Sequence, residues 1–118
     1  MYHLLLHFII PLLIARVFIH HFSVDFAVFT KIKTPKFIVI WALMMLTILI
    51  DLDHLLATPI YQIDRCSIGF HPLHTLLPIL FYFSLCIPKK IRLFGVGLII
   101  HMLLDSIDCQ INTGVWSV

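Results

Sequence analysis

The stretch that decides the fold is residues 100–108, which read IHMLLDSID and lie within a long apolar segment. Ionisable side chains are costly inside such a segment and usually serve a function. His101 and Asp105 are four residues apart, so a helix places them on one face, and Asp108 continues that face. The pattern predicts either ligands for a metal ion or a buried hydrogen bond that joins two helices.

The composition indicates an integral membrane protein. The chain has 118 residues, of which 61% are hydrophobic and only 12% are charged, whereas a soluble domain needs far more polar surface. The formal net charge of +2 is too small to indicate nucleic-acid binding. Because there is no repeat and no long linker, the sequence predicts a single transmembrane domain over residues 1–118.

Four apolar segments predict the fold class and its orientation. We expect an all-α, integral membrane four-helix bundle with helices at about residues 3–22, 37–57, 72–87 and 91–111. The first and third loops carry six cations, whereas the second loop carries only Arg65. By the positive-inside rule, the first and third loops are cytoplasmic. Both termini and the second loop then face the periplasmic side of a bacterial inner membrane.

This orientation brings histidines and aspartates from all four helices to the outer side, although charge bias alone determined it. His20 and His21 lie at the cytoplasmic end and are read as unrelated. Scattered structural histidines would not be expected to gather in this way. The candidate ligands are too many for one tetrahedral ion and suit two or three ions bridged by carboxylates. Imidazole and carboxylate without thiolate favour Zn, with Mn or Fe as alternatives. The candidates are His3, His7, Asp51, Asp53, His54, His71, His74, His101 and Asp105.

Helical periodicity separates the roles of these candidates. His3 and His7 share one helix face, as do Asp51 and His54. Asp53 is turned by about 100° from His54 on an α-helix. It can therefore join the cluster only if the helix end unwinds, or if it serves a second ion or supports the ligands from outside.

The order of these motifs resembles that of a known family. The chain carries Asp-Leu-Asp-His at 51–54, Gly-Phe-His-Pro-Leu-His at 69–74 and His-x-x-x-Asp at 101–105, after an early histidine. Over nearly its whole length it is similar to the bacterial membrane-bound metal-dependent hydrolases, small multi-pass inner-membrane proteins, and to a branch of them with these same stretches. The middle motif of that family, His-Arg-x-x-Thr-His, holds an Arg that is absent here. Arg65 is the candidate to replace its substrate contacts.

The resemblance implies hydrolysis at a site with several metal ions. Such ions supply hydroxide from bound water and stabilise charge in the transition state. Asp53 or Asp108 is the candidate general base. A site in the outer leaflet would suit a phosphoester in a membrane lipid or a lipid-linked substrate, and zinc-dependent phospholipases C use a similar ligand set.

Other functions remain open at this point. Paired transmembrane histidines also bind haem in bis-His sites, although the nearby carboxylates argue against this. The same ligands would serve a metal transporter or sensor, although the inner halves of the segments hold almost no ionisable groups. A purely structural membrane protein would leave the clustered carboxylates unexplained. Formation of a homodimer is also left open for a unit of this size.

The cysteines offer one more set of alternatives. Cys66 and Cys109 both fall on the outer side, where an oxidising periplasm would allow a disulfide between the second loop and the end of the fourth segment. The alternatives are free thiols at both positions, or metal ligation by Cys109.

Overall fold

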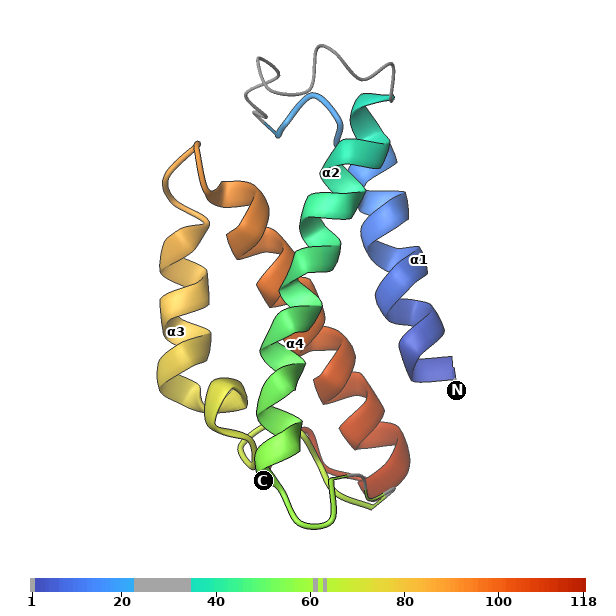
Figure 1. Ribbon diagram of the computed structural model, residues 1–118, viewed down its shortest axis with the longest axis vertical. Coiled ribbons are helices and arrows are strands. Elements are labelled where there is room, and N and C mark those ends of the chain that lie inside the picture. The colour runs from blue at the N-terminus through green and yellow to red at the C-terminus, as the bar shows by residue number, and fades with distance from the viewer. Residues whose placement is uncertain (1, 23–34, 61, 63) are drawn as a thin grey trace.

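The computed structural model describes residues 2–22, 35–60, 62 and 64–118, without the side chains of Tyr2 and His3. The described residues form helices and no strand, which confirms the predicted all-α class. α1, the continuous α2–η2 helix, α3 and α4 run alternately up and down (Figure 1). The elements, with η for 3₁₀ helices, are α1 (Tyr2–Val17), α2 (Lys36–Met45), η2 (Leu46–Leu56), η3 (Pro72–His74), α3 (Leu76–Leu85) and α4 (Arg92–Thr113).

The last helix, α4, holds the bundle together. It packs against α1, α2 and α3, and η2 contacts both α4 and η3. Small residues near the start of α4 allow this close packing. A Cβ atom at Gly97 would lie 2.9 Å from Thr47 Cγ2, and one at Gly95 would lie 2.7 Å from the backbone nitrogen of Cys86. The chain therefore needs glycine at both contacts.

The second helix changes its geometry partway along. It is α-helical up to Met45 and 3₁₀ over the eleven residues Leu46–Leu56. A 3₁₀ helix has three residues per turn, so residues three apart lie in one row. Asp51 and His54 share one such row, whereas Asp53 lies in the row of Thr47, and both Asp53 and Thr47 are buried.

The third predicted helix, 72–87, is broken in the structure. η3 ends at His74, Thr75 is extended, and α3 begins at Leu76. Pro78 explains the break, because it has no N–H to bond to the carbonyl four residues earlier and is tolerated only in the first turn of a helix. The carbonyl of His74 instead accepts a hydrogen bond from Gly69 N at 2.9 Å. The break thus ties η3 to the loop before it.

The first helix ends at Val17, although the sequence predicts a helix up to residue 22. The chain turns over residues 18–21, where His21 N donates to Phe18 O. This turn brings Phe22 back into the core, where it joins a buried cluster with Ala15 and Ile40. Burial of this aromatic ring accounts for the early end of α1.

A disulfide joins the second loop to the end of α4. Cys66 and Cys109 are bonded, with their Cα atoms 4.9 Å apart. Around the bond lies a buried cluster that includes Ile68, Tyr82 and Met102. Of the alternatives that the sequence leaves open, the structure thus contains the disulfide, which fixes the loop against the helix that carries His101 and Asp105.

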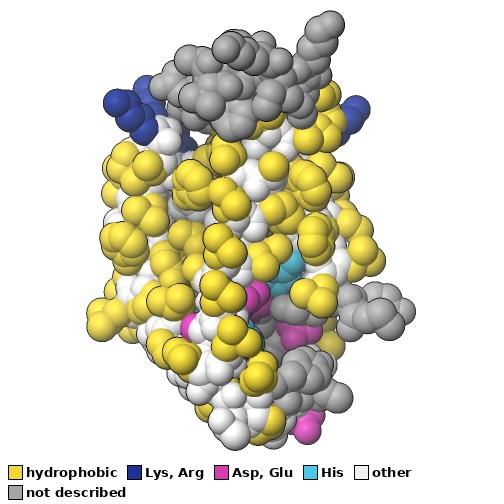
Figure 2. Space-filling model, viewed as in Figure 1, with side chains coloured by type: hydrophobic (Ala, Val, Ile, Leu, Met, Phe, Trp, Pro, Cys, Tyr) yellow, Lys and Arg dark blue, Asp and Glu magenta, His cyan; other side chains and the backbone are white. Residues whose placement is uncertain are grey.

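Two helices are long and apolar enough to cross a membrane, namely Lys36–Leu56 and Arg92–Thr113. The apolar helices Leu4–Val17 and Leu76–Leu85 are shorter. Large hydrophobic side chains are exposed along the helices, and they cover most of the face seen in Figure 2. The visible Lys and Arg side chains lie at one end of this face, and the Asp and His side chains lie in its other half (Figure 2).

Candidate metal centre

Four side chains from η2, η3 and α4 converge at the core of the candidate site. The Nε2 atoms of two histidines and one oxygen from each of two aspartates form a closed ring, in which neighbouring atoms are 3.0, 3.3, 3.1 and 3.5 Å apart. Four ligands about 2.0–2.1 Å from a tetrahedral Zn²⁺ ion would be about 3.3 Å from one another. The ring therefore has the size of a metal site. In ring order its members, which we call the four-residue group, are His101, Asp51, His74 and Asp105.

One nitrogen of the closed ring lacks a hydrogen bond, although His101 Nε2 and Asp51 Oδ1 form one at 3.0 Å. His74 is fully buried, and its Nε2 atom has no hydrogen bond although it lies 3.1 Å from Asp105 Oδ2. A buried polar atom without a hydrogen bond is costly. A cation at the centre of the ring would satisfy it, so the donor set fits a divalent ion.

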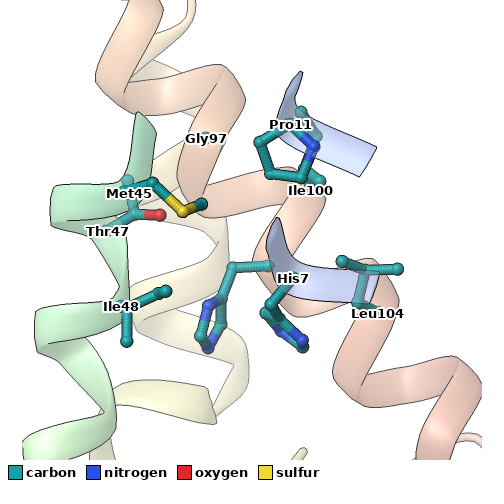
Figure 3. Close-up of a pocket in the computed structure, with 9 residues that line it drawn as sticks. His7, Pro11, Met45, Thr47, Ile48, Gly97, Ile100 and Leu104 are labelled. Carbon is teal, nitrogen blue, oxygen red and sulfur yellow. The ribbon is translucent and has the colours of Figure 1, made fainter. Parts of the chain in front are cut away.

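His7 brings α1 to the same place. Its Nε2 atom lies 3.4 Å from Asp105 Oδ1, and its ring meets that of His101 edge-on with centroids 4.5 Å apart. Beyond these rings is a cavity of about 10 Å³ between α1, α2–η2 and α4, which Pro11, Thr47 and other residues line (Figure 3). His7 therefore borders both the four-residue group and this cavity.

A second set of ligands lies beside the first. Asp53, His54 and His71 each offer a ligand atom, and these atoms lie within 4.8 Å of one another. His54 Nδ1 is 3.1 Å from Asp53 Oδ1, and the rings of His54 and His71 stack with centroids 3.7 Å apart. Burial of His71 lowers its pKa, and electrostatic repulsion from the neighbouring His54 lowers it further. We call these residues the three-residue group.

Asp53 connects the two groups. Its Oδ2 atom accepts a hydrogen bond from Leu73 N at 2.9 Å and lies 3.1 Å from His74 Nδ1. Its Oδ1 atom faces His54. Three residues per turn leave Asp53 about 120° from both Asp51 and His54, compared with about 160° between the two aspartates on an α-helix. The 3₁₀ geometry of η2 thus gives a physical reason why both aspartates reach one cluster.

One side of the cluster is open to the surroundings. The side chain of Asp51 is 34% exposed and that of His54 is 28% exposed, whereas the side chains of His101 and Asp105 are each 2% exposed. A metal site that performs catalysis keeps an open position for water or substrate. The exposed edge of Asp51 and His54 is where such a position would be.

Comparison with known families places the chain. A family model described as "Family of unknown function (DUF6122)" matches residues 1–112. The chain belongs to this family. The match contains every residue of both ligand groups, so the candidate site of this DUF6122 protein lies within the family's domain. Searches of curated proteins and of solved structures found no match. The resemblance to metal-dependent hydrolases stays a prediction.

The remaining predicted site residues lie as follows. The side chain of His3 is outside the described part of the DUF6122 chain. Asp108 is half-buried on α4 and belongs to neither ligand group. The guanidinium of Arg65 donates to the carbonyls of Pro59 and Ile60, at 2.7 Å each. The substrate contact of Arg65 and the general-base roles of Asp53 and Asp108 stay predictions.

Sequence reasoning missed one side chain at this site. Ser67 Oγ lies 3.2 Å from His54 Nε2, on the side of the ring away from the aspartates. Ser67 belongs to the loop after the disulfide cysteine and follows no helical period. Its neighbour Cys66 was the one signal in the sequence that this loop lies over the cluster.

Proposed function

We propose that this chain is a membrane-embedded, metal-dependent hydrolase that cleaves a phosphoester in a lipid or lipid-linked substrate. The observation that carries the proposal is the closed ring of His101, Asp51, His74 and Asp105 atoms, together with the exposed edge of Asp51. The donor set favours Zn²⁺, with Mn²⁺ or Fe²⁺ as alternatives.

The proposed chemistry follows from the open edge of the cluster. When bound, a divalent ion would make water acidic enough to supply hydroxide near neutral pH and would stabilise charge on a phosphoester. Asp51 would present the ligand edge at which substrate arrives, because it is the exposed member of the ring. The buried His74, His101 and Asp105 would hold the position of the centre. Asp53 would fix the orientation of His74 through its Nδ1 atom.

The surface of the molecule supports a location in a membrane. Leu76, Leu77 and Leu80 on α3 are 69%, 78% and 54% exposed. Exposed apolar surface of this extent supports the proposed contact with lipid. Lys89 and Lys90 lie in the loop before α4, at the end opposite the ligand groups. By the positive-inside rule, we propose that this end is cytoplasmic and that the metal centre faces the periplasm across a bacterial inner membrane.

A substrate with an apolar part suits this location. Phe70 and Leu73, which flank His71, are 51% and 39% exposed. Polar and apolar groups thus meet at the edge of the cluster, as they do in a lipid whose phosphate lies at the membrane surface. A transport pathway through one chain is less well supported, because the buried cluster at the other end consists of Ala15, Phe22, Ile40, Met44 and Leu93.

The test is an assay of the detergent-purified, Zn²⁺-loaded protein against phospholipids and lipid-linked phosphates. We expect hydrolysis by the wild type and by Asp64→Asn, which changes an exposed carboxylate outside both groups. Asp105→Ala should lose the ion of the four-residue group and, with it, the activity. A wild-type protein that holds its ions but cleaves none of these substrates would refute the hydrolase, and so would an active, metal-loaded Asp105→Ala protein.

A further inference from the structure

Ser67 contacts both histidines of the three-residue group. Its hydroxyl oxygen lies 3.2 Å from His54 Nε2. Its backbone carbonyl accepts hydrogen bonds from the N–H groups of Phe70 and His71, each at 3.2 Å. The disulfide of the preceding Cys66 fixes this residue against α4. One residue of the second loop thus holds a histidine of η2 by its side chain and the turn before η3 by its backbone.

The orientation of His54 determines which ring nitrogen can bind an ion. Its Nδ1 atom lies 3.1 Å from Asp53 Oδ1 and 3.7 Å from Asp51 Oδ1, so Nδ1 faces the carboxylates and Nε2 faces Ser67. An imidazole that ligates through Nδ1 carries its proton on Nε2, and this N–H needs an acceptor. A serine hydroxyl can fill this role, because its oxygen accepts as well as donates hydrogen bonds.

We propose that Asp53, His54 and His71 bind a second divalent ion, and that Ser67 is the positioning residue that directs the His54 ring toward it by its side chain and holds the backbone at His71 by its carbonyl. This inference rests on the proposed metal centre and extends it. Asp53 can bind the second ion and still support the first group. Its Oδ2 atom contacts Leu73 N and His74 Nδ1, whereas its Oδ1 atom faces His54. His71 stacks on the ring of His54, and its ligand atom lies within 4.8 Å of those of His54 and Asp53.

Asp51 joins the second ion site to the first. Its Oδ1 atom lies 3.0 Å from His101 Nε2, 3.3 Å from His74 Nε2 and 3.7 Å from His54 Nδ1. One carboxylate oxygen therefore borders ligand atoms of both groups, and it belongs to the exposed member of the ring. Two-metal sites of this kind hold the attacking and leaving oxygens of a phosphoester. The second ion thus strengthens the assignment of a phosphoester as the substrate.

The test is a Co²⁺ titration of the detergent-purified full chain, with visible absorption and bound metal measured together. The variants are Ser67→Ala, Ser67→Thr and the control Ser84→Ala, whose hydroxyl bonds to Phe81 O within α3. We expect two equivalents in the wild type. Ser67→Ala should weaken binding of the second ion by about 10–100-fold and change its absorption spectrum, with the first ion unaffected. Ser67→Thr should restore both properties, and Ser84→Ala should behave as the wild type.

Each other outcome overturns a defined part of the account. Unchanged second-ion affinity in Ser67→Ala would refute the role of Ser67 while leaving the metal centre in place. A single equivalent in the wild type would refute the second site. Loss of the second ion in both Ser67→Ala and Ser67→Thr would mean that Ser67 acts through packing, and the inference would fail. No bound ion in the wild type would overturn the inference and the proposed function together. Retention of the first ion by a variant shows that it has folded.

Discussion

The two ligand groups lie side by side but are built in different ways. Two members of the four-residue group, His101 and Asp105, lie one turn apart on the 22-residue helix α4, and Asp51 comes from the helix that packs against it. The three-residue group depends on the loop of residues 66–71, because His71 and Ser67 belong to that loop. A disulfide and a few hydrogen bonds hold the loop in place. Helix packing therefore places three of the four ligands of the first group, with His74 on the short η3, whereas the second group depends on the loop for His71 and for the contact of Ser67 with His54.

This difference has a consequence for how the two groups respond to change. Ligands on packed helices are held by many contacts, so their positions withstand the loss of a single one. Ligands on a loop depend on each anchor of that loop. We therefore expect changes in the loop to affect the three-residue group more than the four-residue group, and changes in the helix contacts to affect the four-residue group first.

The largest effect should come from Asp105→Ala. This carboxylate lies 3.1 Å from His74 Nε2, 3.5 Å from His101 Nε2 and 3.4 Å from His7 Nε2. Its removal leaves three buried imidazoles without their shared anion, so the first ion should be lost altogether. Isothermal titration with Zn²⁺ checks this, with Asp64→Asn as the control. Tight binding of the first ion by Asp105→Ala would exclude the ring as the metal site.

Asp53→Ala should affect both groups, because its carboxylate contacts His54 in one group and His74 in the other. We expect loss of the second ion and a decrease of about 10–100-fold in affinity for the first. Titration of both ions with Co²⁺ measures the two effects separately. If the first ion bound as in the wild type, Asp53 would not support His74, and the two groups would be independent.

Removal of the disulfide by Cys66→Ser with Cys109→Ser should give the clearest difference between the effects on the two ions. The bond closes a loop between residues 43 apart in sequence, and its loss should cost about 2–4 kcal/mol of stability. The second ion should bind more weakly, while the ring on α4, η2 and η3 keeps the first. Thermal unfolding followed by circular dichroism measures the stability, and metal titration measures the ions. Cys86→Ser is the control, since Cys86 is a free thiol. Equal weakening of both ions would contradict the distinction between helix and loop.

Gly97→Ala should have the smallest effect, and unlike removal of the disulfide it should affect the first ion more than the second. The new methyl group would lie 2.9 Å from Thr47 Cγ2 and would push α4 away from η2. We expect a loss of about 1–3 kcal/mol of stability. We also expect the affinity for the first ion to decrease more than the affinity for the second. Leu103→Ala, at an exposed position of the same helix, is the control. A variant in which only the second ion binds more weakly would reverse our assignment of the two groups.

Helical periodicity predicts part of this site from the sequence alone. The spacing of four between His101 and Asp105 predicts a pair whose Nε2 and Oδ2 atoms lie 3.5 Å apart in the structure. The spacing of three between Asp51 and His54 predicts a pair whose Oδ1 and Nδ1 atoms lie 3.7 Å apart. The four apolar segments likewise predict the all-α fold. These features depend on local geometry, which a single sequence contains.

Other parts depend on tertiary contacts and could not be predicted in this way. The sequence does not determine the position of Asp53, because its angle depends on whether residues 46–56 form an α-helix or a 3₁₀ helix. The break at Thr75 follows from Pro78, yet its effect on His74 became visible only with the bond from Gly69. Ser67 lies in a loop without periodicity, so no spacing in the sequence predicts its contact with His54, and only the neighbouring Cys66 points to this loop.

The most direct test of the central claim is the metal content per chain of the detergent-purified protein, measured by elemental analysis beside a His101→Ala, Asp105→Ala double variant. The account predicts two equivalents of Zn, Mn or Fe in the wild type, with the ion of the four-residue group missing in the double variant. A wild-type protein that binds no metal when it is supplied would contradict the account. The two groups would then be a buried network of histidines and aspartates that holds the helices together.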